Sequence, residues 1–383
     1  MTKTNMDGFF KDTELKYFPI LSTKSNSYQN YIDWLEIKFK KANSNDRIQF
    51  LKQKPNINFK NYILLRITLW DNDFETFDYI MNNYNLPLNM NNNIIFRYCC
   101  KNGWQEYVTK LITNKSINIF DINYMAVLYT VKSQNKNILD TLLNVNYYNT
   151  TRLFSYQITA FYEACSDGWL YGVQQLMNKH NYNNLMINTG FNNCCVMNRL
   201  ECAKYIFSLY PNINGEQSLF KAGCNNYFDI VRFLIEEVNV NPSFDNNSCL
   251  AISVLRENYK IVDYLLQFDS VDPNNSFCFN DYDMNIQQYI VKRLKNYNYS
   301  CMLSSLLKTK KFNLTDNNYQ ILFESCENSL YEQLISIIRY SNYYLNNKEK
   351  SFIYPKINKI INNKYDICDN LKLNLINTFL KTC

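Results

Sequence analysis

Residues 218–242 read SLFKAGCNNYFDIVRFLIEEVNVNP, and residues 248–273 read SCLAISVLRENYKIVDYLLQFDSVDP. Each segment contains a short apolar run, a polar break, a longer amphipathic run and a polar exit that ends in proline. Pro211, Pro242 and Pro273 follow one another at intervals of 31 residues. A fixed period of this length is typical of repeats that stack on one another. The sequence therefore predicts an elongated array rather than a closed domain.

A ladder of paired apolar residues extends the same spacing over most of the chain. The two members of a pair are three positions apart, which places them on one face of the second predicted helix of a unit. Successive pairs follow one another at steps of 28 to 34 residues. We expect each pair to be buried against the neighbouring units. The pairs are Phe77/Ile80, Val108/Leu111, Leu139/Leu142, Val173/Leu176, Ala203/Ile206, Val231/Leu234 and Val262/Leu265.

Three further columns of residues fall into register with this ladder. A turn position, five residues before each pair, holds Gly or Asn in most units, and these residues accept the left-handed conformation that closes a helix. An acid often follows it in the first turn of the second helix, where the helix dipole favours negative charge. A small residue next to Cys or Val recurs in the first helix, where closely stacked helices leave little volume. The turn positions are Asn72, Gly103, Gln134, Gly168, Asn198, Asn226 and Glu257; the acids are Glu75, Glu106, Glu201 and Asp229; the small pairs are Cys99/Cys100, Thr130/Val131, Ala164/Cys165, Cys194/Cys195, Gly223/Cys224 and Ser253/Val254.

The period divides the chain into three predicted parts. Residues 1–44 form an N-terminal lead with a capping helix, residues 45–340 form an array of about eight to ten units, and residues 341–383 form a C-terminal cap or tail. The array is expected to be irregular at 274–317, where the period slips. There, residues 290–294 are predicted as a second helix, followed by an extra helix near Cys301–Leu307. The ladder resumes at Leu334/Ile337.

Several segments carry a family resemblance. KNGWQEYVTKLI at 101–112, SDGWLYGVQQLM at 166–177 and NNYFDIVRFLI at 225–235 resemble the N-G-H-L-E-V-V-K-L-L segment of ankyrin repeats. TAFYEAC at 159–165 resembles the T-P-L-H-x-A-A start of the first ankyrin helix, although the tetrapeptide T-P-L-H is nowhere complete. The resemblance covers roughly residues 45–340, most of the chain, and is that of degenerate repeats from a genome of low GC content. It implies an all-α, right-handed solenoid of helix-turn-helix units that binds a protein partner along its concave face.

Few residues suggest catalytic chemistry. His180 is the only histidine in the chain, and a catalytic base or metal ligand needs partners, so we expect a solvated loop residue. None of the 13 cysteines forms a C-x-x-C pair, and seven lie in the small-residue columns when Cys326 of the later unit is included, which predicts reduced, packed thiols without disulfides. We expect no catalytic residue, no metal, no cofactor and no small-molecule substrate.

Two groups of residues are candidates for binding a partner. Trp104 and Trp169 occupy equivalent positions beside the turn glycines. They either cover the end of the helix pair, which we favour, or form an exposed aromatic pair that anchors a partner. Lys308, Lys310 and Lys311 lie in a segment, between Met284 and Thr315, that has six basic residues and no acidic one. We expect these lysines to face solvent and to dock an acidic partner.

The overall composition leaves three functional hypotheses. The first is a monomeric, non-catalytic scaffold for protein–protein interaction. The second is an adaptor that delivers substrates to a modification machine through its non-repeat ends. The third, a nucleic-acid-binding helical array acting through the basic C-terminal third, is weaker because the net charge is only +6. The N-terminus has acidic residues where a signal peptide has an apolar core, which predicts a cytoplasmic or nuclear protein.

Overall fold

The computed structural model describes residues 36–37, 39–53, 63–114, 117, 121–145, 155–274, 276–279, 282–291, 293, 297–309 and 311, and the single residues Ser351, Pro355 and Lys359. Two compact units divide the chain, Met1–Gly190 and Phe191–Cys383. The ladder pair Leu334/Ile337, the candidate Lys310 and nearly all of the predicted tail lie outside the described residues. The predicted boundaries of the three parts stay predictions.

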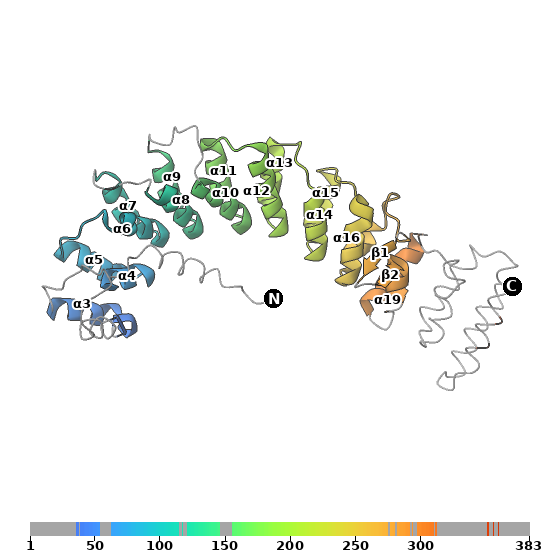
Figure 1. The fold of residues 1–383 in the computed structure, drawn as a ribbon, viewed down its shortest axis with the longest axis horizontal. Helices are drawn as coiled ribbons and strands as arrows, with labels where there is room; N and C mark the ends of the chain where they lie inside the picture. Colours follow the sequence, from blue (N-terminus) through green and yellow to red (C-terminus); the bar gives the residue numbers. More distant parts are fainter. Residues whose placement is uncertain are drawn as a thin grey trace. The chain divides into compact units, whose positions relative to one another are not determined.

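The first unit is a row of helix pairs. Each first helix packs against its own second helix and against the first helices of the neighbouring pairs (Figure 1). A single helix, α3 (Ser44–Gln53), packs against the second helix α5 and occupies the second-helix row. The pairs that follow are α4 (Ile63–Trp70) with α5 (Phe74–Asn83), α6 (Met90–Asn102) with α7 (Gln105–Ile112), α8 (Asp121–Ser133) with α9 (Lys136–Leu143), and α10 (Ser155–Asp167) with α11 (Leu170–Lys179).

The second unit continues the same pattern and adds one hairpin. The first helices α14 and α16 pack together, as do the second helices α15 and α17. The division between the units falls within α12 (Asn184–Val196). The elements after it are α13 (Leu200–Leu209), α14 (Glu216–Cys224), α15 (Phe228–Glu236), α16 (Phe244–Leu255), α17 (Tyr259–Leu265), β1 (Ser276–Phe279), β2 (Tyr282–Asn285), α18 (Ile286–Val291) and α19 (Tyr297–Lys308).

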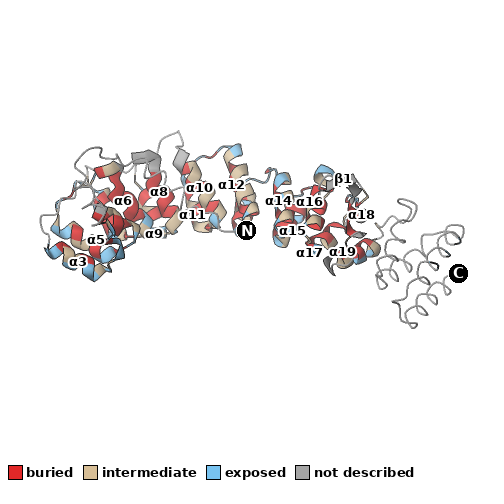
Figure 2. Ribbon diagram, turned by 60° about the horizontal axis from the view of Figure 1, so that its bottom comes forward, coloured by how far each residue is buried: buried red, intermediate tan, exposed pale blue. Residues whose placement is uncertain are grey.

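The ladder residues form the core between the helices. All fourteen are buried, and the most exposed of them, Leu111, shows only 3% of its surface. Leu234 and Leu265 are both fully buried at equivalent positions of neighbouring units, which confirms the alignment. Figure 2 shows the buried residues along the helices of each unit. The described helices therefore stack as an all-α solenoid of repeats, with one short hairpin.

The turn between the two helices of a unit has the predicted left-handed residue in all seven aligned units. The φ angles at these positions run from 52° at Gln134 to 77° at Gly103. In the turn at Gly103, the Trp104 N–H donates to the Cys99 carbonyl at 2.9 Å, and the same six-residue closure recurs at Trp169, Tyr227 and Asn258. This is the hydrogen-bond pattern that closes a helix through a left-handed residue. The predicted turns are thus confirmed.

The small-residue columns are packed between neighbouring first helices. Cys99, Cys100, Cys165, Cys194 and Cys195 are buried, Cys224 is half-buried, and all six are free thiols. Burial raises the pKa of the Cys100 and Cys195 thiols to about 12. At Gly223 an added Cβ would lie 2.7 Å from the Cys249 sulfur, so the stack has no room for a larger residue there. The prediction of packed, unpaired thiols is confirmed.

The segment after α17 differs from the prediction. An antiparallel hairpin, β1–β2, pairs Phe277 with Met284 and comes before α18. Helix α18 packs against α16 in the first-helix row, whereas α19 packs against α17 in the second-helix row. The second helix predicted at residues 290–294 is therefore wrong, because Ile290 belongs to a first helix. The helix predicted as an extra one, near Cys301–Leu307, is the second helix of this unit.

Candidate protein-binding surface

The two predicted tryptophans cover the start of a second helix. Trp104 is 9% exposed and stacks near Phe77, with ring centroids 4.5 Å apart, and near Phe74 at 5.5 Å. Trp169 is 8% exposed and lies over Gly172, where an added Cβ would come within 2.2 Å of the indole ring. Both rings are buried, as the packing interpretation predicts. Their part in binding a partner stays a prediction.

Tyrosine–carboxylate pairs join consecutive second helices. Each tyrosine hydroxyl donates to an acid of the preceding unit, so these polar groups bind one another across the repeat interface. Sequence reasoning missed them, because with 32 tyrosines in the chain no single tyrosine stands out. The pairs are Tyr107 to Asp78 at 2.6 Å, Tyr171 to Asp140 at 2.6 Å and Tyr264 to Glu236 at 3.0 Å. These hydroxyl and carboxylate groups on the second helices therefore already have hydrogen-bond partners within the chain.

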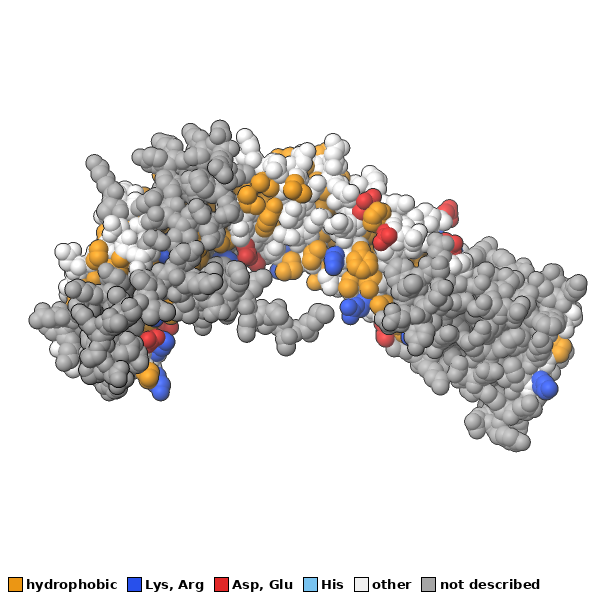
Figure 3. Space-filling view, viewed as in Figure 1, with side chains coloured by type: hydrophobic (Ala, Val, Ile, Leu, Met, Phe, Trp, Pro, Cys, Tyr) orange, Lys and Arg blue, Asp and Glu red, His pale blue; other side chains and the backbone are white. Residues whose placement is uncertain are grey.

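The first helices of the second unit present a different surface. In α14, after Glu216 in its first turn, the residues that reach solvent recur at spacings of three, four and seven, which is one face of a helix. The neighbouring helix α16 adds a short stripe of its own. We call this surface the α14–α16 face, and its residues are Gln217, Phe220, Lys221, Cys224, Ile252, Leu255 and Arg256. Figure 3 shows basic and hydrophobic side chains together over this region.

The two basic residues of the α14–α16 face are exposed and have no carboxylate partner within the described ranges. The Lys221 ammonium lies 5.7 Å from the centroid of the Phe220 ring, so the charge stays next to an apolar group. On the second-helix face, by contrast, Lys204 binds Glu237 at 2.7 Å. The face therefore presents two positive charges that have no carboxylate partner in the described structure. It also presents apolar side chains that are only partly covered.

Residues 194–276 match the family model for ankyrin repeats (3 copies). The chain carries ankyrin repeats. The matched segment contains the whole α14–α16 face. No curated protein matches the chain.

The predicted basic segment follows the matched ankyrin repeats. Lys308 is exposed at the end of α19, whereas the Lys311 ammonium donates to the carbonyl oxygens of Phe268 and, at 2.7 Å, of Val271. Burial lowers the pKa of Lys311, against the opposite effect of nearby aspartates. The expectation that these lysines face solvent is therefore wrong for Lys311. The loop after α17 leaves carbonyl groups without helical partners, and Lys311 supplies the donor.

His180 also differs from its prediction as a solvated loop residue. It follows α11 in the first unit, is only 7% exposed, and lies with its ring 6.1 Å from that of Tyr182. Tyr182 stacks on Phe161 at 4.4 Å, and this contact holds the loop against α10. Burial, with a smaller effect of Lys179, lowers the pKa of His180 to about 4. The expectation of solvent exposure is wrong.

The described part of the array contains no cluster of three or more His, Cys, Asp or Glu side chains that could hold a metal ion. None of the described helices combines the length and apolar character that a membrane crossing requires.

Proposed function

We propose that the chain is a non-catalytic scaffold that binds an acidic, partly apolar segment of another protein through the α14–α16 face. Ankyrin repeats are generally protein–protein interaction modules, and residues 194–276 match them. The observation that carries the proposal is the pair of exposed basic residues, Lys221 and Arg256, beside half-buried apolar side chains. The family resemblance implies that partners bind along a concave face of the repeats, and we propose the α14–α16 face for that role.

The two faces of the repeats differ in what they leave available. On the second helices, hydroxyl and carboxylate groups already bind one another, as in Tyr171 and Asp140. On the α14–α16 face, Phe220, Ile252 and Leu255 still have surface to bury, at about 25 cal/mol per Å². Complementary charge would steer association and set the register, while the apolar contacts would supply most of the affinity.

The test uses a displayed library of random peptides selected on the full chain. We expect the selected peptides to be rich in Asp and Glu next to aromatic or aliphatic residues. The double variant Lys221→Glu/Arg256→Glu should weaken their binding by about tenfold or more, since each contact becomes repulsive.

The matched control is Lys110→Glu/Lys204→Glu, which changes the net charge equally but on second helices. It should leave binding unchanged apart from a small general effect of charge. Peptides without acidic residues, or peptides that respond equally to both double variants, would refute the proposed face.

We propose further that Lys308, exposed at the end of α19 in the second-helix row, is a separate contact for an acidic partner. The buried free thiols, such as Cys165 and Cys194, fit a reducing, intracellular compartment. Treatment with an oxidant should change the thermal stability of the chain little if these thiols stay inaccessible.

A further inference from the structure

Two Asn–Gly dipeptides occur in the chain, Asn102–Gly103 and Asn214–Gly215. In such a pair the backbone nitrogen of glycine can attack the side-chain amide carbon of asparagine, because no Cβ shields it. Whether the attack takes place depends on what the folded chain does with the two reacting groups. The two dipeptides have opposite surroundings.

At Asn102 both groups are held in hydrogen bonds. The Gly103 N–H donates to the Cys99 carbonyl at the end of α6. The Asn102 amide nitrogen donates to the Leu69 carbonyl of the preceding unit at 2.8 Å. Attack would require both bonds to break and the helix end to open, so this dipeptide is protected.

At Asn214 the attacking nitrogen belongs to a buried glycine but, among the described residues, it is not held in a hydrogen bond as the nitrogen of Gly103 is. Asn214 is exposed just before α14, and the Gly215 N–H donates to no described residue. The Asn214 side-chain oxygen accepts from the Glu216 N–H at 2.9 Å. Negative charge develops on that oxygen during attack, and a hydrogen-bond donor already in place stabilises it. The side-chain nitrogen, which leaves, donates to the Glu216 carboxylate at 3.1 Å.

We propose that Asn214 is a site of spontaneous deamidation in the folded protein. The Gly215 nitrogen loses its proton to a base and forms a bond to the side-chain carbon of Asn214. The new bond closes a five-membered ring. The bond from that carbon to the side-chain amide nitrogen then breaks, the base returns the proton to this nitrogen, and ammonia leaves, so that the ring is an imide. Water then opens the imide at one carbonyl or the other and leaves aspartate or isoaspartate. The net reaction consumes one water and releases one ammonia.

The product disturbs a tightly packed position. A Cβ built on Gly215 would lie 2.9 Å from a Val240 methyl group and 3.0 Å from a Leu234 methyl group, so this backbone cannot shift toward them. Isoaspartate inserts an additional backbone carbon directly before Gly215, and both products add a negative charge beside Glu216. We expect deamidation to loosen the packing of the loop before α14 on α15 and to lower the melting temperature.

The experiment ages the full chain at neutral pH, in the native state and in denaturant, and follows both dipeptides by peptide mass spectrometry. In the native chain Asn214 should convert at least about tenfold faster than Asn102, because two hydrogen bonds protect the latter. In denaturant the two rates should converge, which shows that the fold, not the local sequence, separates them. Fragmentation distinguishes isoaspartate from aspartate.

Asn214→Gln is the matched variant, since it keeps an amide but would need a larger ring. Aged wild-type protein should melt at a lower temperature than fresh protein, whereas Asn214→Gln should not change with age. Equal native rates at the two dipeptides, or conversion of Asn214 only in denaturant, would overturn the proposal. An unchanged melting temperature after conversion would overturn the predicted loosening.

Discussion

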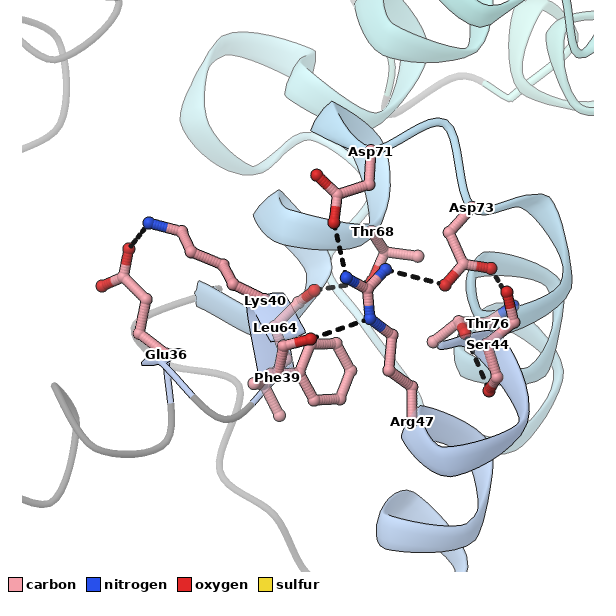
Figure 4. Close-up of polar contacts among 10 residues, drawn as sticks. All are labelled: Glu36, Phe39, Lys40, Ser44, Arg47, Leu64, Thr68, Asp71, Asp73 and Thr76. Carbon is pink, nitrogen blue, oxygen red and sulfur yellow. Dashed lines mark hydrogen bonds and ion pairs between the residues drawn. The ribbon is translucent and has the colours of Figure 1, made fainter. Parts of the chain in front are cut away.

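Replacing Arg47 with methionine tests how the N-terminal end of the described array is held together (Figure 4). Arg47 of α3 is only 4% exposed, and its guanidinium joins three parts of the chain. It donates to the Phe39 carbonyl at 2.9 Å, to the Asp73 carboxylate at 2.9 Å, and to Asp71 at 2.5 Å. Asp73 in turn accepts from the Thr76 N–H and so begins helix α5.

The two ion pairs of Arg47, with Asp73 and with Asp71, should contribute different free energies to stability. The Asp73 side chain is 6% exposed, and breaking a buried pair by removing one partner costs about 3–5 kcal/mol. The Asp71 side chain is 45% exposed, and an ion pair of that kind contributes about 0–1 kcal/mol. Arg47→Met should therefore destabilise the α3–α5 region strongly, whereas Asp71→Asn should have little effect.

The same cluster predicts a dependence on pH. Burial alone would raise the pKa of Asp73, but hydrogen bonds from Thr76, Arg47 and Ser44 outweigh it, so the pKa lies below 3.8. A carboxyl group with a lowered folded-state pKa adds stability above its unfolded-state pKa. That stability is lost as the pH falls below about 4, and Asp73→Asn should remove this part of the acid sensitivity.

Amide hydrogen exchange is the appropriate assay, because a repeat array can open at one end without unfolding as a whole. Arg47→Met should speed exchange in α3, α4 and α5 and leave α13 to α17 unchanged. In the double variant Arg47→Met/Asp73→Asn the loss should be smaller than the sum of the two single losses. Unchanged exchange in α3–α5, or strictly additive losses, would refute the reasoning.

Three further predictions follow from individual contacts. Leu265→Ala should cost about 2–5 kcal/mol in denaturant unfolding, whereas Met197→Ala, at a residue 44% exposed, should stay within about 0.5 kcal/mol; equal losses would contradict the ladder. Gly172→Ala should displace the Trp169 ring, which lies 2.2 Å from the new Cβ, and change the tryptophan fluorescence; an unchanged spectrum would contradict this packing. His180 has a folded pKa of about 4 and an ordinary value of 6.5, so the unfolded chain binds the proton first and stability falls as the pH drops from 6.5 to 4, by on the order of 2–3 kcal/mol. His180→Phe should abolish that loss, and an identical pH profile in the variant would contradict it.

The turn column shows how far residue type predicts this fold. Gly103 and Asn198 mark left-handed turns by their identity, because they tolerate positive φ better than other residues. Gln134 and Glu257 do not, yet they adopt φ of 52° and 60° at the same place in their units. The helices stacked on either side fix the path of the chain there, and this outweighs the local preference. Register along the array was therefore a better predictor than the single residue.

The candidate surface was less accessible to sequence reasoning. Lys221 and Arg256 look like ordinary solvated charges in the sequence, and only the structure shows that Lys204 pairs with Glu237 whereas these two have no carboxylate partner among the described residues. Lys311 lies in an acid-free segment, but its partners are backbone carbonyls, which leave no trace in the pattern of charges. His180 lies among polar residues in the sequence. Its burial follows from the stacking of Tyr182, in the loop after α11, on Phe161 of α10. The spacing of residues alone does not predict this contact.

The irregular segment illustrates the difference between distance along the chain and position in the stack. The buried pair Leu303/Leu306 of α19 repeats the ladder spacing, but Leu306 comes 41 residues after Leu265. The excess over the usual 31 equals the ten residues of the hairpin from Ser276 to Asn285. An insertion in a surface loop lengthens the chain without changing which helices pack together, so the period alone predicts the second helix too early. With the hairpin set aside the period returns at once, because Ile337, outside the described residues, lies 31 residues after Leu306. The sequence thus predicts Leu334/Ile337 as the next pair of the same ladder rather than the start of a separate arrangement.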